Sequence, residues 1–319
     1  MSHIKHLLQQ LKHRAFLAGT DVQKIRQARQ LRQNPEFAQQ LQNLQKHFEL
    51  PTLPYTSGIW AVAMVKNEQD VIVDSIEHLY AQGVNQILVV DNLSTDSTYE
   101  LLQELSQKYP LIVGRDHEPA YYQSAKMTVL SDLALAHGAQ WVVPFDADEF
   151  WYGTDGTLAE VLQQGVHSSG IMQARIHNQF PQPDGTWLID TQAHHDVKVA
   201  FKPTKYSVVQ MGNHAVLRPG VPETEKLMIV HRPWRSLEQF TRKIRQGARS
   251  LELTNLPQEL GYHWRVLGES SDAELEELWN KLVTGQEVPE VVAWRPKGEL
   301  ATLSVKTPQR WSEISKLLS

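Results

Sequence analysis

The sequence predicts an α/β protein in which a mostly parallel sheet is flanked by helices. Between residues 59 and 145, four short apolar runs alternate with segments whose apolar residues recur at helical spacing. Strands that alternate with helices over short connections form parallel sheets covered by helices. In such sheets ligands bind beyond the carboxyl ends of the strands, so the residues that follow each apolar run are candidate site residues.

The individual elements follow from the apolar pattern and its end signals. Each predicted strand is a short apolar run suited to burial on both faces. Ser97 and Glu100 form an S-x-x-E capping box for the second helix, and Gly83 and Gly138 stop the first and third helices. The predicted strands are 59–65, 86–90, 111–113 and 141–145, and the helices between them begin near Ile72, Ser97 and Tyr121.

Changes of pattern divide the chain into three predicted segments. Residues 1–54 form a helical N-terminal extension that ends in the stiff, proline-bounded linker 51–54. Residues 55–235 hold the sheet, which continues beyond the fourth strand in shorter strand-like pieces. Residues 236–319 form a mainly helical C-terminal region, whose first helices open at serine-led capping boxes.

Composition and charge suggest a compartment and exclude some partners. The chain has no cysteine, and its longest apolar run, 59–65, is far shorter than the ~20 residues that span a bilayer. We therefore expect a cytoplasmic protein. Residues 1–50 carry eight Lys/Arg and three acids, a charge of +5 against −10 for the rest. Such helices either present a solvated basic face, pack on the core, form a homodimer or touch the inner face of a membrane; we expect no nucleic acid partner.

Acidic and amide side chains collect where three of the predicted strands end. The three stretches are Lys66-Asn67-Glu68, Asp91-Asn-Leu-Ser-Thr-Asp96 and Asp146-Ala-Asp148-Glu149. Asp and Asn are common turn and cap residues, and capping alone would explain Asp96. Three such stretches on one sheet edge are nevertheless costly unless a cation or hydrogen-bond donors offset their charge. Asp146 and Asp148 are the sharpest pair, because carboxylates at i and i+2 of a turn can reach one hard cation.

The three stretches are more specific together than apart. They read Val-Lys66-Asn-Glu, Val-Val-Asp91-Asn-Leu-Ser-Thr-Asp-Ser-Thr and Trp-Val-Val-Pro-Phe-Asp146-Ala-Asp-Glu-Phe, and Tyr122-Gln-Ser124 accompanies them. This combination resembles family-2-type glycosyltransferases, in the branch with an Asp-x-Asp-Glu-Phe motif. The resemblance is clearest over 59–152, with a weaker echo in Val197-Lys198-Val and His231-Arg-Pro-Trp-Arg-Ser236. It implies a Rossmann-like glycosyltransferase A-type catalytic domain over 55–235, with helical extensions at both ends.

The resemblance also implies a UDP- or GDP-type nucleotide-sugar donor and a divalent metal, Mn or Mg. Asp91 would bind the base or ribose. The other implied donor-binding residues are Lys66, Asn67, Glu68, Asp96, Gln123 and Asp146. Asp146 and Asp148 would hold the metal, with His231 as the first choice and His214 as the second choice to complete the set. The basic residues Arg242, Lys243 and Arg245 would assist at the diphosphate, unless they are merely solvated.

The implied reaction is a direct displacement that inverts the anomeric centre, and it needs a base for the acceptor hydroxyl. Glu149 is the nearest spare carboxylate, although orienting Asp148 or a basic residue is an equally good role for it. Asp190 and Asp196 are the downstream alternatives. The acceptor is a glycan, a lipid-linked molecule or a small molecule, and Trp151, Tyr152 and Trp187 are candidates for stacking on a sugar ring.

His194, His195 and Asp196 also suggest a metal site. In an extended strand, however, side chains at i and i+1 point to opposite faces, so we expect a loop in which the two rings share no ion.

Two other functions compete with sugar transfer. A nucleotidyltransferase that makes nucleotide sugars would need a glycine-rich loop after the first strand, where this chain has Lys66-Asn-Glu and no glycine before Gly83. A non-catalytic binding module would not need Asp91, Asp146 and Asp148 together.

Overall fold

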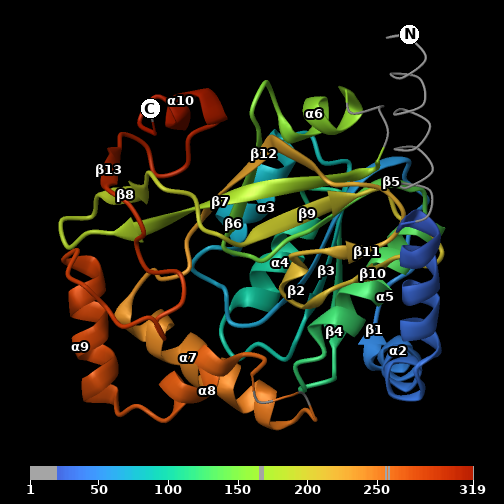
Figure 1. The fold of residues 1–319 in the computed structure, drawn as a ribbon, viewed down its shortest axis with the longest axis horizontal. Helices are drawn as coiled ribbons and strands as arrows, with labels where there is room; N and C mark the ends of the chain where they lie inside the picture. Colours follow the sequence, from blue (N-terminus) through green and yellow to red (C-terminus); the bar gives the residue numbers. More distant parts are fainter. Residues whose placement is uncertain (1–19, 165–168, 256, 258, 319) are drawn as a thin grey trace, which may run out of the picture.

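The computed structural model describes residues 20–164, 169–255, 257 and 259–318, and most of their strands build one large mixed sheet (Figure 1). Across this sheet the order is β1 (Phe48–Glu49), β4 (Leu111–Asp116), β3 (Gln86–Asp91), β2 (Gly58–Val65), β5 (Ala139–Pro144), β9 (Val197–Phe201), β7 (Ile171–Pro181), β12 (Glu223–His231) and β6 (Glu149–Gly153). β8 (Trp187–Asp190) pairs with β7, and β13 (Leu300–Leu303) pairs with β8. A separate ladder joins β10 (Val208–Val209) to β11 (Val216–Leu217).

The four predicted strands form the parallel half of the sheet. β4, β3, β2 and β5 pair in parallel in that order. The chain thus adds β3 and β4 on one side of β2 and then returns to place β5 on the other side. This confirms the predicted fold class, and the reversal between β2 and β5 marks the crevice where such sheets bind ligands.

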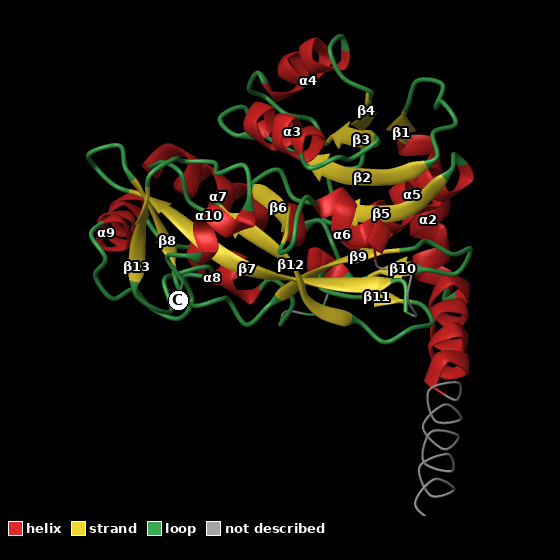
Figure 2. Cartoon of the chain, turned by 90° about the horizontal axis from the view of Figure 1, so that it is seen from above, coloured by secondary structure: helices red, strands yellow, loops and turns green. Residues whose placement is uncertain are grey.

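Helices cover both faces of the parallel half, as Figure 2 shows. α3 (Ile72–Ala81) and α4 (Thr98–Ser106) lie on one face, and α5 (Gln123–Ala136) and α2 (Pro35–His47) on the other. Successive residues of β2 serve the two faces: Ala61 packs with the α3 side and Trp60 with the α5 side, and both are fully buried. Burial on both faces explains why these strands are continuous apolar runs in the sequence.

The second half of the sheet is mixed, and its register positions the site. β12 runs parallel to β7 and antiparallel to β6. This places His231, the last residue of β12, opposite Glu149 on one side and Asn178 on the other. The backbone amide of Arg232 also donates to the carbonyl of Asp148 at 2.9 Å. Residues separated by about 80 positions in the sequence are therefore held side by side by backbone pairing.

The C-terminal region is largely helical, as predicted. Its elements are α7 (Leu237–Glu252), α8 (Tyr262–Gly268), α9 (Asp272–Val283) and α10 (Trp311–Ser315). α6 (Leu158–Gln164) precedes them in the chain and shares a core cluster with α10. The side chains of Ser236 and Ser271 accept bonds from the amides of Gln239 and Glu274, which confirms both predicted caps. α7, α8 and α9 share a core with Trp234 and Phe180.

One predicted cap is wrong. The side chain of Ser97 makes no capping bond to α4. Asp96 does the work instead, because its Oδ1 accepts from the amide of Thr98 at 3.0 Å and from the hydroxyl of Thr98 at 2.5 Å.

The N-terminal helices pack on the sheet domain. Residues 20–33 are helical, and Arg32 pairs with Asp132 of α5 at 2.8 Å. Lys24 donates to the carbonyl of Gly220, and Arg29 lies over the ring of Tyr206, so part of the basic face is used within the molecule. The apolar residues predicted to form the first helical stripe, Leu7, Leu8 and Leu11, lie outside the described residues. Within the described part, no helix combines the length and apolarity needed to cross a bilayer. The boundaries predicted near 54 and 235 stay predictions.

Candidate active site

A cavity of about 300 Å³ opens at the carboxyl ends of β2 and β5. Its floor comes from the ends of these strands, and α7, α8 and the segment around Trp294 supply the facing wall. Of the first-choice residues predicted for donor, metal and base, six line the cavity, as does His214, the second choice for the metal; the six are Lys66, Glu68, Gln123, Asp146, Asp148 and His231. Four do not: Asn67, Asp91, Asp96 and Glu149.

Asp148 lies at the centre of a cluster of basic groups. Its side chain is only 2% exposed, and its Oδ2 contacts the Nζ of Lys243. Nε2 of His231 and a guanidinium nitrogen of Arg235 lie 3.5 and 3.6 Å from the same oxygen. Burial by itself would raise the pKa of Asp148, but the nearby Lys243 ammonium and His231 hold it well below its usual range. Asp148 is therefore a carboxylate in this cavity.

Asp146 is bound differently, although it lies two residues away. Its side chain is 34% exposed, its Oδ2 accepts from Lys198 at 2.5 Å, and its Oδ1 accepts from Asn213 at 3.3 Å. Lys198 is buried in β9 and also contacts Glu149 at 2.7 Å. Burial opposes the charge of Lys198, but these two carboxylates raise its pKa above the ordinary value.

Glu149 lies beneath the cavity rather than in it. One oxygen pairs with Lys198, and the other accepts from the backbone amide of Asp146 at 3.2 Å. Burial raises the pKa of Glu149 to about 8. Lys198 opposes this shift only in part, because its one ammonium is shared by two carboxylates. The geometry argues against the predicted role of Glu149 as the base. It favours the alternative, in which Glu149 orients a basic residue and the loop that carries Asp146.

His231 presents one free nitrogen to Asp148. Its Nδ1 lies 2.9 Å from Oδ1 of Asn178, and an amide oxygen can only accept, so Nδ1 carries the proton. The lone pair of Nε2 is then directed towards Oδ2 of Asp148. Burial lowers the pKa of His231 despite that carboxylate, which keeps the ring neutral.

His214, the second choice for the metal site, lies on the Asp146 side of the cavity. Its Nδ1 donates to the carbonyl of Val197 at 2.8 Å, so its Nε2 is an acceptor. Burial lowers its pKa. Gly212 has a φ of +77°, and a side chain there would collide with the ring of His214, so the glycine is needed for this arrangement.

Three predicted donor-binding residues hold the loops of the site together. Asn67 accepts from the amide of Thr95 at 2.7 Å and donates to Gln246 of α7 at 2.8 Å. Asp96 caps α4, as described above. Asp91 is fully buried and pairs with Arg115 at 3.3 Å. Its Oδ1 is also buried and has no hydrogen-bond partner among the described residues.

Glu68 and Arg235 form a second ion pair at the cavity. Arg235 contacts Glu68 at 2.5 Å and Asp70 at 2.7 Å. It follows β12 by only four residues and so joins the β2 end to α7. The sequence analysis did not select Arg235 or Lys198 as site residues, although both lie in the segments that carry the weaker resemblance. Lys198 is a lone charge in the apolar strand Val-Lys-Val-Ala-Phe, and a buried charge requires a partner.

The aromatic wall of the cavity is not the predicted one. Trp151 and Tyr152 are 0% and 1% exposed and belong to the core, and Trp187 does not line the cavity. Tyr121, Trp264 and Trp294 line it instead. Trp264 packs so closely on Gly247 of α7 that a Cβ there would lie 2.9 Å from its ring.

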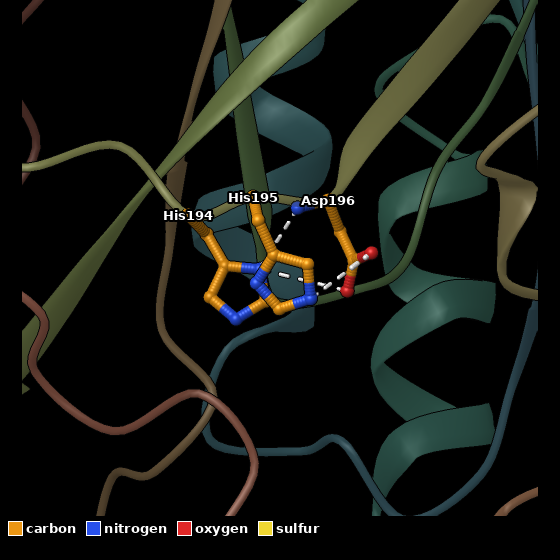
Figure 3. Close-up of side chains that lie close together, drawn as sticks. All are labelled: His194, His195 and Asp196. Atoms are coloured by element: carbon orange, nitrogen blue, oxygen red, sulfur yellow. Dashed lines mark hydrogen bonds and ion pairs between the residues drawn. The ribbon is translucent and has the colours of Figure 1, made fainter.

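The rings of His194 and His195 also differ from the prediction (Figure 3). They lie in a loop, as expected, but on the same side of it, with centroids 4.2 Å apart. Together with Asp196 they are the group in the described residues whose potential metal-ligand atoms all lie within 4.8 Å of one another. Nδ1 of His194 accepts from the amide of Asp196 at 3.2 Å, and its ring packs at a tilt against Trp294. These contacts account for the arrangement without an ion.

Comparisons with known proteins give one family match and two distant structural similarities. Residues 61–190 match the family model described as Glycosyl transferase family 2. No curated protein matches the chain. Among solved structures, S. aureus TarS 1-349 in complex with UDP-GlcNAc is similar at 13% identity over 66% of this chain and 71% of that one, with a TM-score of 0.37. The mannosyltransferase PcManGT from Pyrobaculum calidifontis, in complex with GDP-Man and Mn2+, is similar at 15% identity over 89% and 88%, also with a TM-score of 0.37.

Both structural similarities are distant, so the assignment rests on the family match together with the parallel sheet and its strand-end motifs. Residues 61–190, less than half of the chain, are similar to glycosyltransferase family 2, and this similarity supports sugar transfer as the activity.

Proposed function

We propose that the cavity between β2 and β5 transfers a sugar from a UDP- or GDP-type donor to a hydroxyl group of the acceptor, with inversion and with help from a divalent metal. The observation that carries this proposal is the convergence of Asp148, His231 and Lys243 at one wall of the cavity. An anionic donor fits such a wall, because Lys243 and a divalent cation held by Asp148 and His231 would stabilise phosphate charge.

The residues present fit a divalent metal. Asp148 Oδ2 and His231 Nε2 both present lone pairs and lie 3.5 Å apart, which suits two ligands of one cation. The proton on Nδ1 of His231 is fixed by Asn178, the usual arrangement behind a metal-binding imidazole. Asp146 would reach the same cation only after leaving Lys198. When bound, the metal would neutralise charge that builds on the leaving diphosphate.

Donor binding gives Asp91 and Lys66 a common role. Asp91 Oδ1 is a buried acceptor without a described partner, and such atoms normally find one. A ribose hydroxyl or a base N–H would satisfy it only if the loops around Asp91 open, because Asp91 is fully buried and does not line the cavity. The predicted contact of Asp91 with the nucleoside requires that opening. Lys66 lines the cavity, where burial lowers its pKa, and its amine is available to the phosphates.

We also propose His214 as the base in place of Glu149. Its Nε2 accepts, its ring is neutral, and it lines the cavity on the side of Asp146. A neutral imidazole with a fixed Nδ1 proton can take the proton of an acceptor hydroxyl as that oxygen attacks the anomeric carbon.

Thermal unfolding with UDP and GDP, each with and without Mn2+, tests the proposal. A ligand at 100 times its dissociation constant adds about 2.7 kcal/mol of stability. Stabilisation by one nucleotide that increases with Mn2+ is expected. No response to either nucleotide would rule out the proposal and leave a binding module for another ligand as the better reading.

A further inference from the structure

The position of Lys243, between the cavity and Asp148, suggests a specific role beyond adding positive charge. It lies in the second turn of α7, and its Nζ contacts the same oxygen of Asp148 that faces His231. Its side chain is 25% exposed and lines the cavity, while Asp148 is almost completely buried. The oxygen best placed to bind a divalent cation is thus already bound to an ammonium group.

The neighbouring basic residues of α7 are committed elsewhere. Arg242 donates to the carbonyl of Asn67 and pairs with Glu238, and Arg245 donates to the carbonyls of Gly268 and Ser270. Neither lines the cavity. Of these three described residues, Lys243 is the one whose side chain lines the cavity.

We propose that Lys243 is a displaceable counter-ion that competes with the divalent cation for Oδ2 of Asp148 and moves to the donor diphosphate when that cation binds. The inference rests on the proposed function, because it needs a nucleoside diphosphate in the cavity. Lys243 would then act as a positioning residue for the donor and would couple cation binding to donor binding.

The physical argument is one of charge balance. An ammonium and a divalent cation on one carboxylate oxygen repel each other, so the cation can bind there only if the ammonium withdraws. If a partly buried ammonium leaves its carboxylate and finds no other anion, the free-energy cost of its desolvation is no longer offset. Glu68, the other carboxylate near Lys243, is already paired with Arg235 at 2.5 Å. A diphosphate supplies the missing anion, so cation and donor should each increase the affinity for the other.

Lys243 also has room to move. Its stem is an unbranched chain on a helix surface, and its Nζ lies 5.9 Å from the ring centroid of Trp234, close enough for contact along the stem. Rotation about its side-chain bonds carries the ammonium from Asp148 into the cavity while the backbone of α7 stays fixed by the Ser236 cap and the contacts of Arg245.

The test measures Mn2+ binding to the full chain, by the electron paramagnetic resonance signal of free Mn2+, with no nucleotide, with UDP and with GDP. The variants are Lys243→Met and Lys243→Gln, and the control is Arg242→Met, which removes one charge from the same helix.

In the wild type we expect one nucleotide to tighten Mn2+ binding about tenfold, within the usual range of coupling between sites. In both Lys243 variants we expect Mn2+ alone to bind about tenfold tighter than to the wild type, and the nucleotide effect to shrink to about twofold or less. Arg242→Met should behave as the wild type.

If the wild type binds a nucleotide, two results overturn the inference alone. The first is that Mn2+ affinity without nucleotide is unchanged in both Lys243 variants. The second is that Mn2+ affinity without nucleotide falls in both variants. Failure of the wild type to bind either nucleotide overturns the proposed function and this inference with it. Melting curves show whether each variant is folded. If Lys243→Met does not fold, Lys243→Gln still provides the test.

Discussion

The two halves of the sheet bring opposite charges to the cavity. The parallel half and its following loop contribute Glu68, Asp146 and Asp148, and of the basic residues only Lys66. The mixed half and α7 contribute the cations Lys198 and Lys243, together with the neutral ring of His231. Either half alone would hold a concentration of one charge that is costly to bury. Since each half supplies the counter-charge of the other, the site forms only where the two meet.

This division explains why the two acids of the Asp146-Ala-Asp148 motif differ. Asp148 lies at the seam itself, where the Arg232 amide binds its carbonyl and the cations of the mixed half surround its carboxylate. Asp146 is more exposed and has a single ammonium partner, Lys198. The following predictions test how far each half depends on the other.

The largest effect should follow from Asp148→Asn. The variant keeps the shape but removes the charge that faces His231 and Lys243. We expect transfer activity to fall by about 10³-fold, as for the loss of a central electrostatic group. Steady-state kinetics with the preferred donor check this, and Asp146→Asn should lose less because Asp146 is only half-enclosed. Equal losses in both variants would contradict the distinction between the two acids.

Lys198→Met should affect stability rather than only activity. It leaves Asp146 and Glu149 without their shared ammonium in a buried place, and breaking a buried ion pair costs about 3–5 kcal/mol. Urea unfolding of the variant measures the loss. The matched control is Lys202→Met, just beyond the end of β9. Among the described residues no acidic side chain pairs with Lys202, so we expect a change within about 0.5 kcal/mol. Similar values for the two variants would show that the seam is not held by this pair.

His214→Phe should separate chemistry from donor binding. The ring shape is nearly kept, but the accepting Nε2 is lost, so transfer should fall by about 10²-fold while nucleotide affinity stays within a factor of two. Turnover and nucleotide titration, measured on the same preparation, decide this. An unchanged rate would show that His214 is not the base and would favour one of the acids of the site instead.

A smaller effect concerns pH and the contact between the halves. His78 of α3 bonds the carbonyl of Trp151 in β6 at 2.8 Å, and burial lowers the pKa of His78 to about 4. In the unfolded chain the ring takes up a proton near pH 6.5, and in the folded protein only near pH 4. The stability that the neutral ring contributes is therefore complete above about pH 6.5 and is lost as the pH falls towards 4.

Urea unfolding between pH 7 and pH 4 tests this point. Wild type should lose up to about 3 kcal/mol more than His78→Gln over that range. Parallel profiles for the two proteins would show that His78 does not link the halves in this way.

The parallel half was predictable from the sequence because its information is local. Strands such as β2 are continuous apolar runs with glycines and caps at their ends, and strand-end motifs are contiguous residues. Local sequence patterns also led to some wrong predictions for single residues. Asp96 and Ser97 both look like caps, and only the observed turn shows that Asp96 bonds Thr98. Trp151 resembles a sugar platform by its position after the motif, but it is fully buried.

The sequence by itself determined the α/β sheet, the edge at which the cavity opens and the acids that lie there. Only the tertiary structure decided which side chains complete those acids. Lys198, Arg235 and Lys243 come from later elements, and their pairing with Asp146, Glu68 and Asp148 depends on the register of β9, β12 and α7. A charge in the sequence carries no record of its partner, because an ion pair is selected by distance and burial, which arise only when distant segments are packed together.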